Sequence, residues 1–228
     1  LSDGFKETAA AWRLLLERDG LEALVADILG RREAFLGFST ELASLAEFEA
    51  QYELAAKLHS LHPGDPGVLL ALLMNLVWLE PGQAIYLDAG QIHAYVSGLG
   101  VEVMAASDNV LRGGLTEKHI DATELRNIVD FSTLEIEPLE AATEVNGLYR
   151  YPSVAQDYVL YRVEVSGQNL LADLSLTNDS IVICTAGELA VGDSTGEREV
   201  LHKGEAAYLS GAKFYSFSGA GTAFLATT

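Results

Sequence analysis

The sequence predicts an α+β fold, in which an N-terminal helical region precedes antiparallel β-strands of the cupin-like, jelly-roll kind. Two different sequence patterns along the chain predict this fold. Up to about residue 77, apolar residues recur at helical spacing. After Pro81, short runs of β-branched and aromatic residues alternate with glycine and polar turn residues. A helical layer followed in sequence by a layer of strands defines the α+β class.

The helical part is read from its apolar spacing and its turn residues. One amphipathic helix is predicted before Gly20 and another after it. A third is predicted over "TELASLAEFEAQYELAAKLHSLH". The other expected boundaries are a helix cap at Thr40, a stop at Pro63-Gly64, a helix from Val68 to about Met74 and a strand from Val77 to Leu79.

The chain is divided into three parts. Residues 1–77 form the helical region, residues 78–134 form cupin-like strands that carry the candidate site, and residues 135–228 form a C-terminal jelly roll without metal ligands. The boundary near residue 135 rests on "TEKHIDATELRNIVDFS", which predicts a helical turn before a linker. In the third part, "VGDSTGEREV" predicts a β-hairpin.

Composition excludes several classes of partner. Of 228 residues, 49% are hydrophobic and 21% are charged, and 14 basic against 33 acidic residues give a net charge of −19. This acidity disfavours nucleic acid and anionic membrane surfaces. The polar start "LSDGFKET" does not have the pattern of a signal peptide, and we expect a cytoplasmic location. The single cysteine, Cys184, excludes an internal disulfide and is expected in the core.

One strand–turn pattern is predicted to occur twice. "PGQAIYLDAGQIHAYVSG" and "KGEAAYLSGAKFYSFSG" align from Gly82 and Gly204, and His93 and Tyr215 each follow eleven residues later. We interpret each copy as a turn, a strand, a tight bend and a returning strand. Tyr215 is then expected to fill the interior of the second copy, as a packed phenol in place of a metal ligand.

The first copy also has the spacing of the second cupin motif. Gly82, Gly90 and His93 match it, while Asp88 replaces a proline and Ser97 an asparagine. The histidine of that motif is a metal ligand inside a jelly-roll barrel. Without this spacing, a histidine on an apolar strand is more often a hydrogen-bonded core residue. Nothing in the chain resembles the H-x-H and glutamate half of a cupin site, so the metal site is expected to be incomplete.

The run "GVEVMAASDNVLRGGLTEKHI" follows this motif. Its alternation predicts a strand over Val101–Ala105 with Glu102 on the face opposite the valines. Arg112 and Lys118 then lie in a loop that contains glycines. Each cation is either a solvated surface charge or part of a positive site for a phosphate or a developing oxyanion.

These segments resemble a known family. "PGQAIYLDAGQIHAYVSGLGVEVMAASDNVLRGGLTEKHID" is similar to the corresponding segment of the type I phosphomannose isomerases, the mannose-6-phosphate isomerases. "HPGDPGVLLALLMN" and "ELRNIVDF" resemble the family's segments on either side, over about residues 62–131. One departure is Glu117, where the family has the proline of a TPK signature.

The resemblance implies an enzyme that interconverts mannose 6-phosphate and fructose 6-phosphate through a cis-enediol, with zinc as cofactor and a small phosphorylated sugar as partner. It places His93 as the last zinc ligand and Tyr95 as a pocket residue. The family's other zinc ligands come from an N-terminal jelly roll. We therefore expect this chain to be the C-terminal part of such an isomerase and inactive alone. The alternative is a non-catalytic sugar-phosphate-binding cupin module.

Four further positions take their expected roles from the resemblance. Arg112 stands at the family's active-site arginine, which would stabilise the enediolate. Lys118 matches the lysine associated with the substrate phosphate. Glu102 and Asp108 match pocket carboxylates proposed for proton transfer, and the residues alone do not identify which is the base.

Overall fold

The structure is a computed structural model of the chain, and it describes residues 20–30, 32–47, 52–107, 110–152, 155–167 and 171–228. The helix expected before Gly20 lies outside these residues. The chain forms two compact units. The first comprises Leu1–Val77, Leu87–Val96 and Asp108–Glu135, and the second comprises Trp78–Tyr86, Ser97–Ser107 and Ile136–Thr228.

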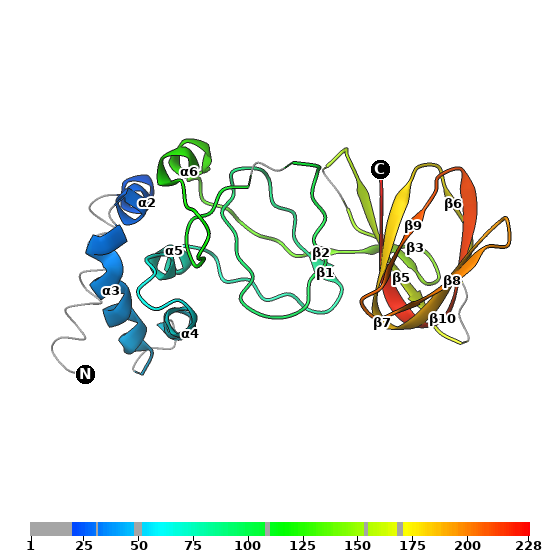
Figure 1. Cartoon of the computed structure of the whole chain (residues 1–228), viewed down its shortest axis with the longest axis horizontal. Coiled ribbons are helices and arrows are strands. Elements are labelled where there is room, and N and C mark those ends of the chain that lie inside the picture. The colour runs from blue at the N-terminus through cyan, green and yellow to red at the C-terminus, as the bar shows by residue number, and fades with distance from the viewer. Residues whose placement is uncertain (1–19, 31, 48–51, 108–109, 153–154, 168–170) are drawn as a thin grey trace. The chain divides into compact units, whose positions relative to one another are not determined.

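The first compact unit is helical (Figure 1). Its elements are α2 (Leu21–Gly30), α3 (Arg32–Ser44), the 3-10 helix η1 (Leu45–Glu47), α4 (Glu53–Leu61), α5 (Gly67–Leu72) and α6 (Ala122–Ile128). Apolar residues of α2 at helical spacing are all buried, namely Leu24, Val25, Ile28 and Leu29. They pack with Leu69 and Leu70 of α5 and Leu125 of α6 in one core cluster. This packing brings α6 onto the earlier helices although it comes much later in the sequence.

The helix expected to begin at Thr40 differs from the one observed. Thr40 lies inside α3, which ends at Ser44 and is followed by the 3-10 turn η1. The Ser44 hydroxyl donates a hydrogen bond to the Glu41 carbonyl at 2.6 Å. Serine side chains that bond to the nearby backbone compete with continued helix, which accounts for an end at this residue. The short helix expected from Val68 is present as α5, whereas Val77–Leu79 is not a strand.

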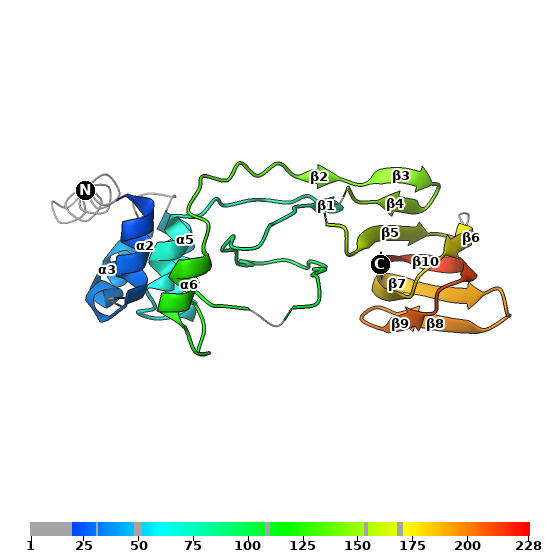
Figure 2. The same ribbon diagram turned by 90° about the horizontal axis from the view of Figure 1, so that it is seen from above.

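The second compact unit is built on one antiparallel sheet. Its strands are β3 (Ala142–Val145), β4 (Leu148–Arg150), β5 (Val159–Val165), β6 (Leu171–Leu176), β7 (Ser180–Asp193), β8 (Arg198–His202), β9 (Ala206–Leu209) and β10 (Lys213–Thr227). The order is β3-β4-β5-β10-β7-β8, with β6 also on β10 and β9 on β7. The long strands β7 and β10 lie side by side in Figure 2 and pair from Asp193↔Tyr215 to Ser180↔Thr227. The mostly antiparallel α+β class is therefore confirmed.

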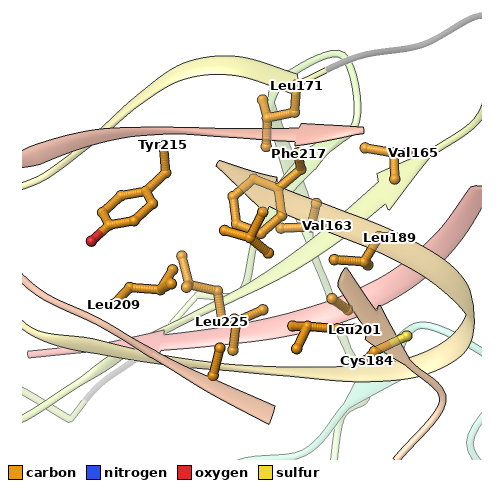
Figure 3. Close-up of a cluster of buried hydrophobic side chains, with 14 of the residues drawn as sticks. Val163, Val165, Leu171, Cys184, Leu189, Leu201, Leu209, Tyr215, Phe217 and Leu225 are labelled. Atoms are coloured by element: carbon orange, nitrogen blue, oxygen red, sulfur yellow. The ribbon is translucent and has the colours of Figure 1, made fainter. Parts of the chain in front are cut away.

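Alternate residues of these strands form the core shown in Figure 3. Tyr215 and Phe217 project from β10 into this cluster, where Phe217 is fully buried. Cys184 is also fully buried, as expected. The hairpin predicted by "VGDSTGEREV" is confirmed as β7 and β8. At its turn, the Asp193 carboxylate accepts from the backbone N–H of Thr195 and Glu197 and pairs with Lys213 Nζ at 2.6 Å.

The strands predicted in residues 78–107 are wrong for this chain. Within these residues the structure has only the two-residue β1 (Gln83–Ala84), which pairs with β2 (Leu139–Glu140). The predicted strands over "AIYLD" and "VEVMAAS" are irregular beyond Ala84. An extended segment becomes a strand only when a neighbour supplies the ladder of hydrogen bonds, and the described residues provide none there.

Across the described helices, none combines the length and apolarity required to cross a membrane.

Candidate functional site

His93 lies on an irregular segment of the first compact unit, and its side chain is exposed. Its Nδ1 is 2.9 Å from the Gln91 carbonyl oxygen. Because a carbonyl only accepts, Nδ1 carries the proton, and Nε2 is the basic nitrogen of the neutral ring. The ring of Tyr95 stands edge-on to it, with 6.5 Å between centroids. Tyr95 itself is 74% exposed.

The segment that carries His93 is held by backbone contacts to the end of α6. The Asp130 N–H donates to the Gly90 carbonyl at 3.0 Å. A Cβ at Gly90 would come within 2.7 Å of the Ile128 carbonyl oxygen, and Gly90 has φ +84°. Glycine is required here on both grounds, because only it accepts this φ and this approach without strain. The turn before His93 is therefore anchored although it belongs to no strand.

A zinc site is not assembled by the described side chains. No group of three or more His, Cys, Asp or Glu residues among them could hold a metal ion. With Nδ1 bonded to the Gln91 carbonyl, His93 has the tautomer of a metal-ligating histidine whose other ring nitrogen donates to a backbone carbonyl. A catalytic zinc takes three or more protein ligands. Among the described residues only His93 was predicted for that role, so they do not fit zinc by themselves.

Arg112 and Lys118 delimit a loop of the first compact unit, called here the 112–118 loop. Arg112 is half-buried and Lys118 is exposed. Arg112 forms no ion pair with a residue that the structure describes, and the Lys118 N–H donates to Thr116 Oγ1 at 3.2 Å. Glu117 is exposed beside Lys118. The loop thus presents two cations without an observed carboxylate partner in the described part of the chain.

The centre of this loop is docked on α5 by Asp65. Asp65 Oδ1 accepts from the Gly67 N–H at 2.7 Å, and Oδ2 accepts from the Leu115 N–H at 3.0 Å. Leu115 has φ +54°, a left-handed conformation that costs a leucine about 1–2 kcal/mol. One carboxylate therefore joins the start of α5 to a residue 50 positions later in the chain.

Close packing reinforces this docking. A Cβ at Gly114 would lie 2.7 Å from Gly67 Cα, and a Cβ at Gly67 would lie 2.9 Å from Gly114 Cα. At Gly113, by contrast, the nearest atoms are side-chain carbons of Leu70 and Leu125 at an ordinary 3.5 Å. The Leu115 side chain packs on the small cluster of α4 and α5 residues. The two backbones touch, so the loop has little freedom to move toward or away from α5.

Of the two expected carboxylates, only Glu102 lies among the described residues. Glu102 is exposed and belongs to the second compact unit. Asp108 lies outside the described residues. His93, Tyr95, Arg112 and Lys118 all belong to the first compact unit.

The turns of the predicted repeat are alike, whereas its strands are not. In Glu80–Gln83 and His202–Glu205, the fourth N–H donates to the first carbonyl at 2.9 Å, and the fourth side chain accepts from the first N–H at 2.9 Å. Gly82 and Gly204 have φ +93° and +92°. After the turn, β9 and β10 form in the second copy, but residues 85–97 remain irregular in the first. The prediction of strands in both copies is therefore wrong for the first.

Tyr215 is buried, as predicted for the second copy. It is 5% exposed, and its hydroxyl donates to the Ser210 carbonyl at 2.9 Å. The phenol is therefore a packed and hydrogen-bonded core residue, whereas His93 eleven residues after the equivalent glycine is exposed.

Asp65 and Gly67 were not predicted from the sequence as parts of the site. Both lie in "HPGDPG", for which the sequence predicted only a helix stop at Pro63-Gly64 and a resemblance to the family. The local signal for Asp65 is an aspartate two residues before the first amide of a helix, a spacing that favours an Asx turn. Its second partner, Leu115, could not be found from local sequence.

Curated proteins similar to this chain are mannose-6-phosphate isomerases. Identity is 36% over 170 residues with the Salmonella typhimurium protein, covering 72% of this chain and 41% of that protein. It is 49% over 80 residues with the probable mannose-6-phosphate isomerase of Dictyostelium discoideum, covering 35% and 18% respectively. It is 33% over 153 residues with the Bos taurus protein, covering 65% and 36%. The matched segments thus cover less than half the length of each of these relatives. No protein-family model matches it.

Solved structures agree with these relatives. An arginine-to-alanine mutant of Salmonella typhimurium phosphomannose isomerase has a TM-score of 0.77 at 25% identity, covering 99% of this chain and 59% of that one. The Salmonella typhimurium enzyme bound to its substrate and a zinc atom has a TM-score of 0.75 at 24% identity, covering 98% and 61%. The fold is therefore that of the cupin-type α+β proteins. Within that class, the resemblance to the type I phosphomannose isomerases is confirmed.

Proposed function

We propose that the protein containing this chain interconverts mannose 6-phosphate and fructose 6-phosphate in the cytoplasm. The observation that carries the proposal is the 112–118 loop, which holds Arg112 and Lys118 on one docked backbone in a chain similar to mannose-6-phosphate isomerases. A cation pair in a protein with net charge −19 is a local exception that suits an anionic sugar.

In this proposal, the two cations act on different parts of the substrate. Lys118 binds the phosphate as a point charge. Arg112 stabilises the negative charge that develops on the enediolate oxygens when a proton leaves C2 of the open-chain aldose. A carboxylate, Glu102 or Asp108, accepts that proton and returns it to C1, while the hydroxyl proton on O2 passes to O1, so that the aldose becomes the ketose without net gain or loss of atoms.

The family's zinc would polarise the sugar oxygens as a Lewis acid when bound. His93 would hold it through Nε2, together with ligands beyond those that the described residues supply. Solved variants of the Salmonella enzyme replace a histidine and an arginine by alanine. The two replaced residues are as far apart in the sequence of that enzyme as His93 and Arg112 are in this chain. This equal spacing supports the zinc-ligand role proposed for His93 and the active-site role proposed for Arg112.

We also propose that residues 1–77 form a helical part of that protein and residues 135–228 a cupin-like part without metal ligands. The helices α2–α5 and the buried Tyr215 support it. The chain alone is then expected to be inactive.

The test is the isomerisation of mannose 6-phosphate by the intact protein, with fructose 6-phosphate measured in a coupled assay. Arg112→Ala should lower kcat by about 10²–10³-fold, as removal of one preorganised donor does. The matched control is Arg126→Ala, because Arg126 is an exposed arginine on α6 of the same compact unit. Equal activity of the two variants would remove Arg112 from its role.

The second candidate is a non-catalytic sugar-phosphate-binding module. The described residues include no group of three or more side chains that could hold a metal ion, which favours this alternative. Binding of mannose 6-phosphate by the intact, zinc-loaded protein without turnover would establish this alternative in place of the isomerase.

A further inference from the structure

We propose that Asp65 is a positioning residue for the 112–118 loop. Its carboxylate holds the backbone at Leu115 and thereby sets where Arg112 and Lys118 stand relative to one another. What the two cations bind rests on the proposed function, whereas the docking of the loop rests on the hydrogen bonds and contacts alone.

Both oxygens of the Asp65 carboxylate accept a backbone hydrogen bond. Its Oδ1 accepts from the Gly67 N–H at 2.7 Å and its Oδ2 from the Leu115 N–H at 3.0 Å. Hydrogen bonds to an ionised acceptor are stronger than bonds between neutral groups. Leu115 is three residues from each cation, so a fixed peptide at this point shortens the free length of chain that carries either one.

The left-handed backbone of Leu115 makes the hydrogen bond necessary rather than incidental. A leucine rarely adopts φ +54° unless its surroundings impose it. Here the N–H is held by Asp65, the side chain packs on the α4 and α5 cluster, and the preceding Gly114 touches Gly67. Without the carboxylate, relaxation of Leu115 toward an ordinary φ would turn the chain that leads to Lys118.

The first experiment measures the docking on the chain itself. Hydrogen exchange of the Leu115 amide should be at least tenfold faster in Asp65→Ala than in the wild type. Asp65→Asn should also accelerate it, because an amide of the same shape can accept from one N–H while its NH₂ faces the other donor. The control is Leu24→Ala, which weakens the α2 core without touching the loop. Unchanged exchange at Leu115 in Asp65→Ala would overturn the proposal.

The second experiment measures the consequence in the intact protein. Asp65→Asn should lower kcat/KM for mannose 6-phosphate by about 10–100-fold through both a lower kcat and a higher KM, since a displacement of about 1 Å can cost about 10²-fold. Leu24→Ala should lower thermal stability but leave kcat per folded molecule unchanged. Equal kcat and KM in Asp65→Asn and wild type would overturn the positioning role. An inactive wild type would refute the proposed function, and the exchange at Leu115 would then decide on Asp65 alone.

Discussion

Truncation of Tyr215 should strongly destabilise the second compact unit. Tyr215 projects from β10 into the core and is 5% exposed. Tyr215→Ala removes a whole ring from a packed site, which for buried aromatic residues costs about 3–5 kcal/mol in the free energy of unfolding. Tyr215→Phe keeps the ring and removes only the hydroxyl that donates to the Ser210 carbonyl. That loss should cost about 1 kcal/mol, so most of the effect of alanine comes from the ring.

The neighbouring residue on the same strand provides the matched control. Phe214 points to the other face of β10 and is 54% exposed. Phe214→Ala should change the stability by less than about 1 kcal/mol, because little of its ring leaves water on folding.

The measurement must report on this compact unit rather than on the whole chain. Native-state hydrogen exchange of the β10 amides gives the local free energy of opening. Urea unfolding followed by circular dichroism should rank the variants in the same order of stability. The reasoning is refuted when Tyr215→Ala and Phe214→Ala have equal effects, since the buried ring would then contribute no more than the exposed one.

Two further predictions concern the loop contact and the hairpin. Gly114→Ala should destabilise the first compact unit by more than about 1 kcal/mol, because its Cβ would meet backbone at 2.7 Å, whereas Gly113→Ala has room and should be nearly neutral; thermal unfolding of the two variants checks this. The Lys213 side chain, with Thr195, lowers the pKa of Asp193 well below its usual 3.8. The ionised Asp193 carboxylate therefore contributes its full stabilisation above about pH 4, and this stabilisation is lost as the pH falls through the lowered pKa. Asp193→Asn should lower Tm by several degrees at pH 7 and flatten the fall of Tm below pH 4, whereas exposed Asp157→Asn should do neither; a finding that both variants follow the wild-type profile would exclude the ion pair as the cause.

Local pattern was sufficient where an element depends on its own residues. The apolar positions of α2 recur every three to four residues, and that face is the buried one. Cys184 lies on a strand with alternating apolar residues and is buried as the alternation predicted, and Tyr215 is buried as its place in the repeat predicted. The turns at Gly82 and Gly204 also follow from sequence, since a glycine with positive φ and a following Gln or Glu are enough to close them.

Long-range contacts decided the rest. "AIYLD" and "VEVMAAS" have the composition of strands, yet a strand exists only where another segment pairs with it, and that partner is not encoded in either run. The same holds for the candidate site. Arg112 and Lys118 were expected from a resemblance in sequence. The contact of Asp65 with the 112–118 loop was not, because it exists only where the fold places the start of α5 against Leu115. A contact that spans 50 residues is set by how the helices pack, and no periodicity within either segment carries that information.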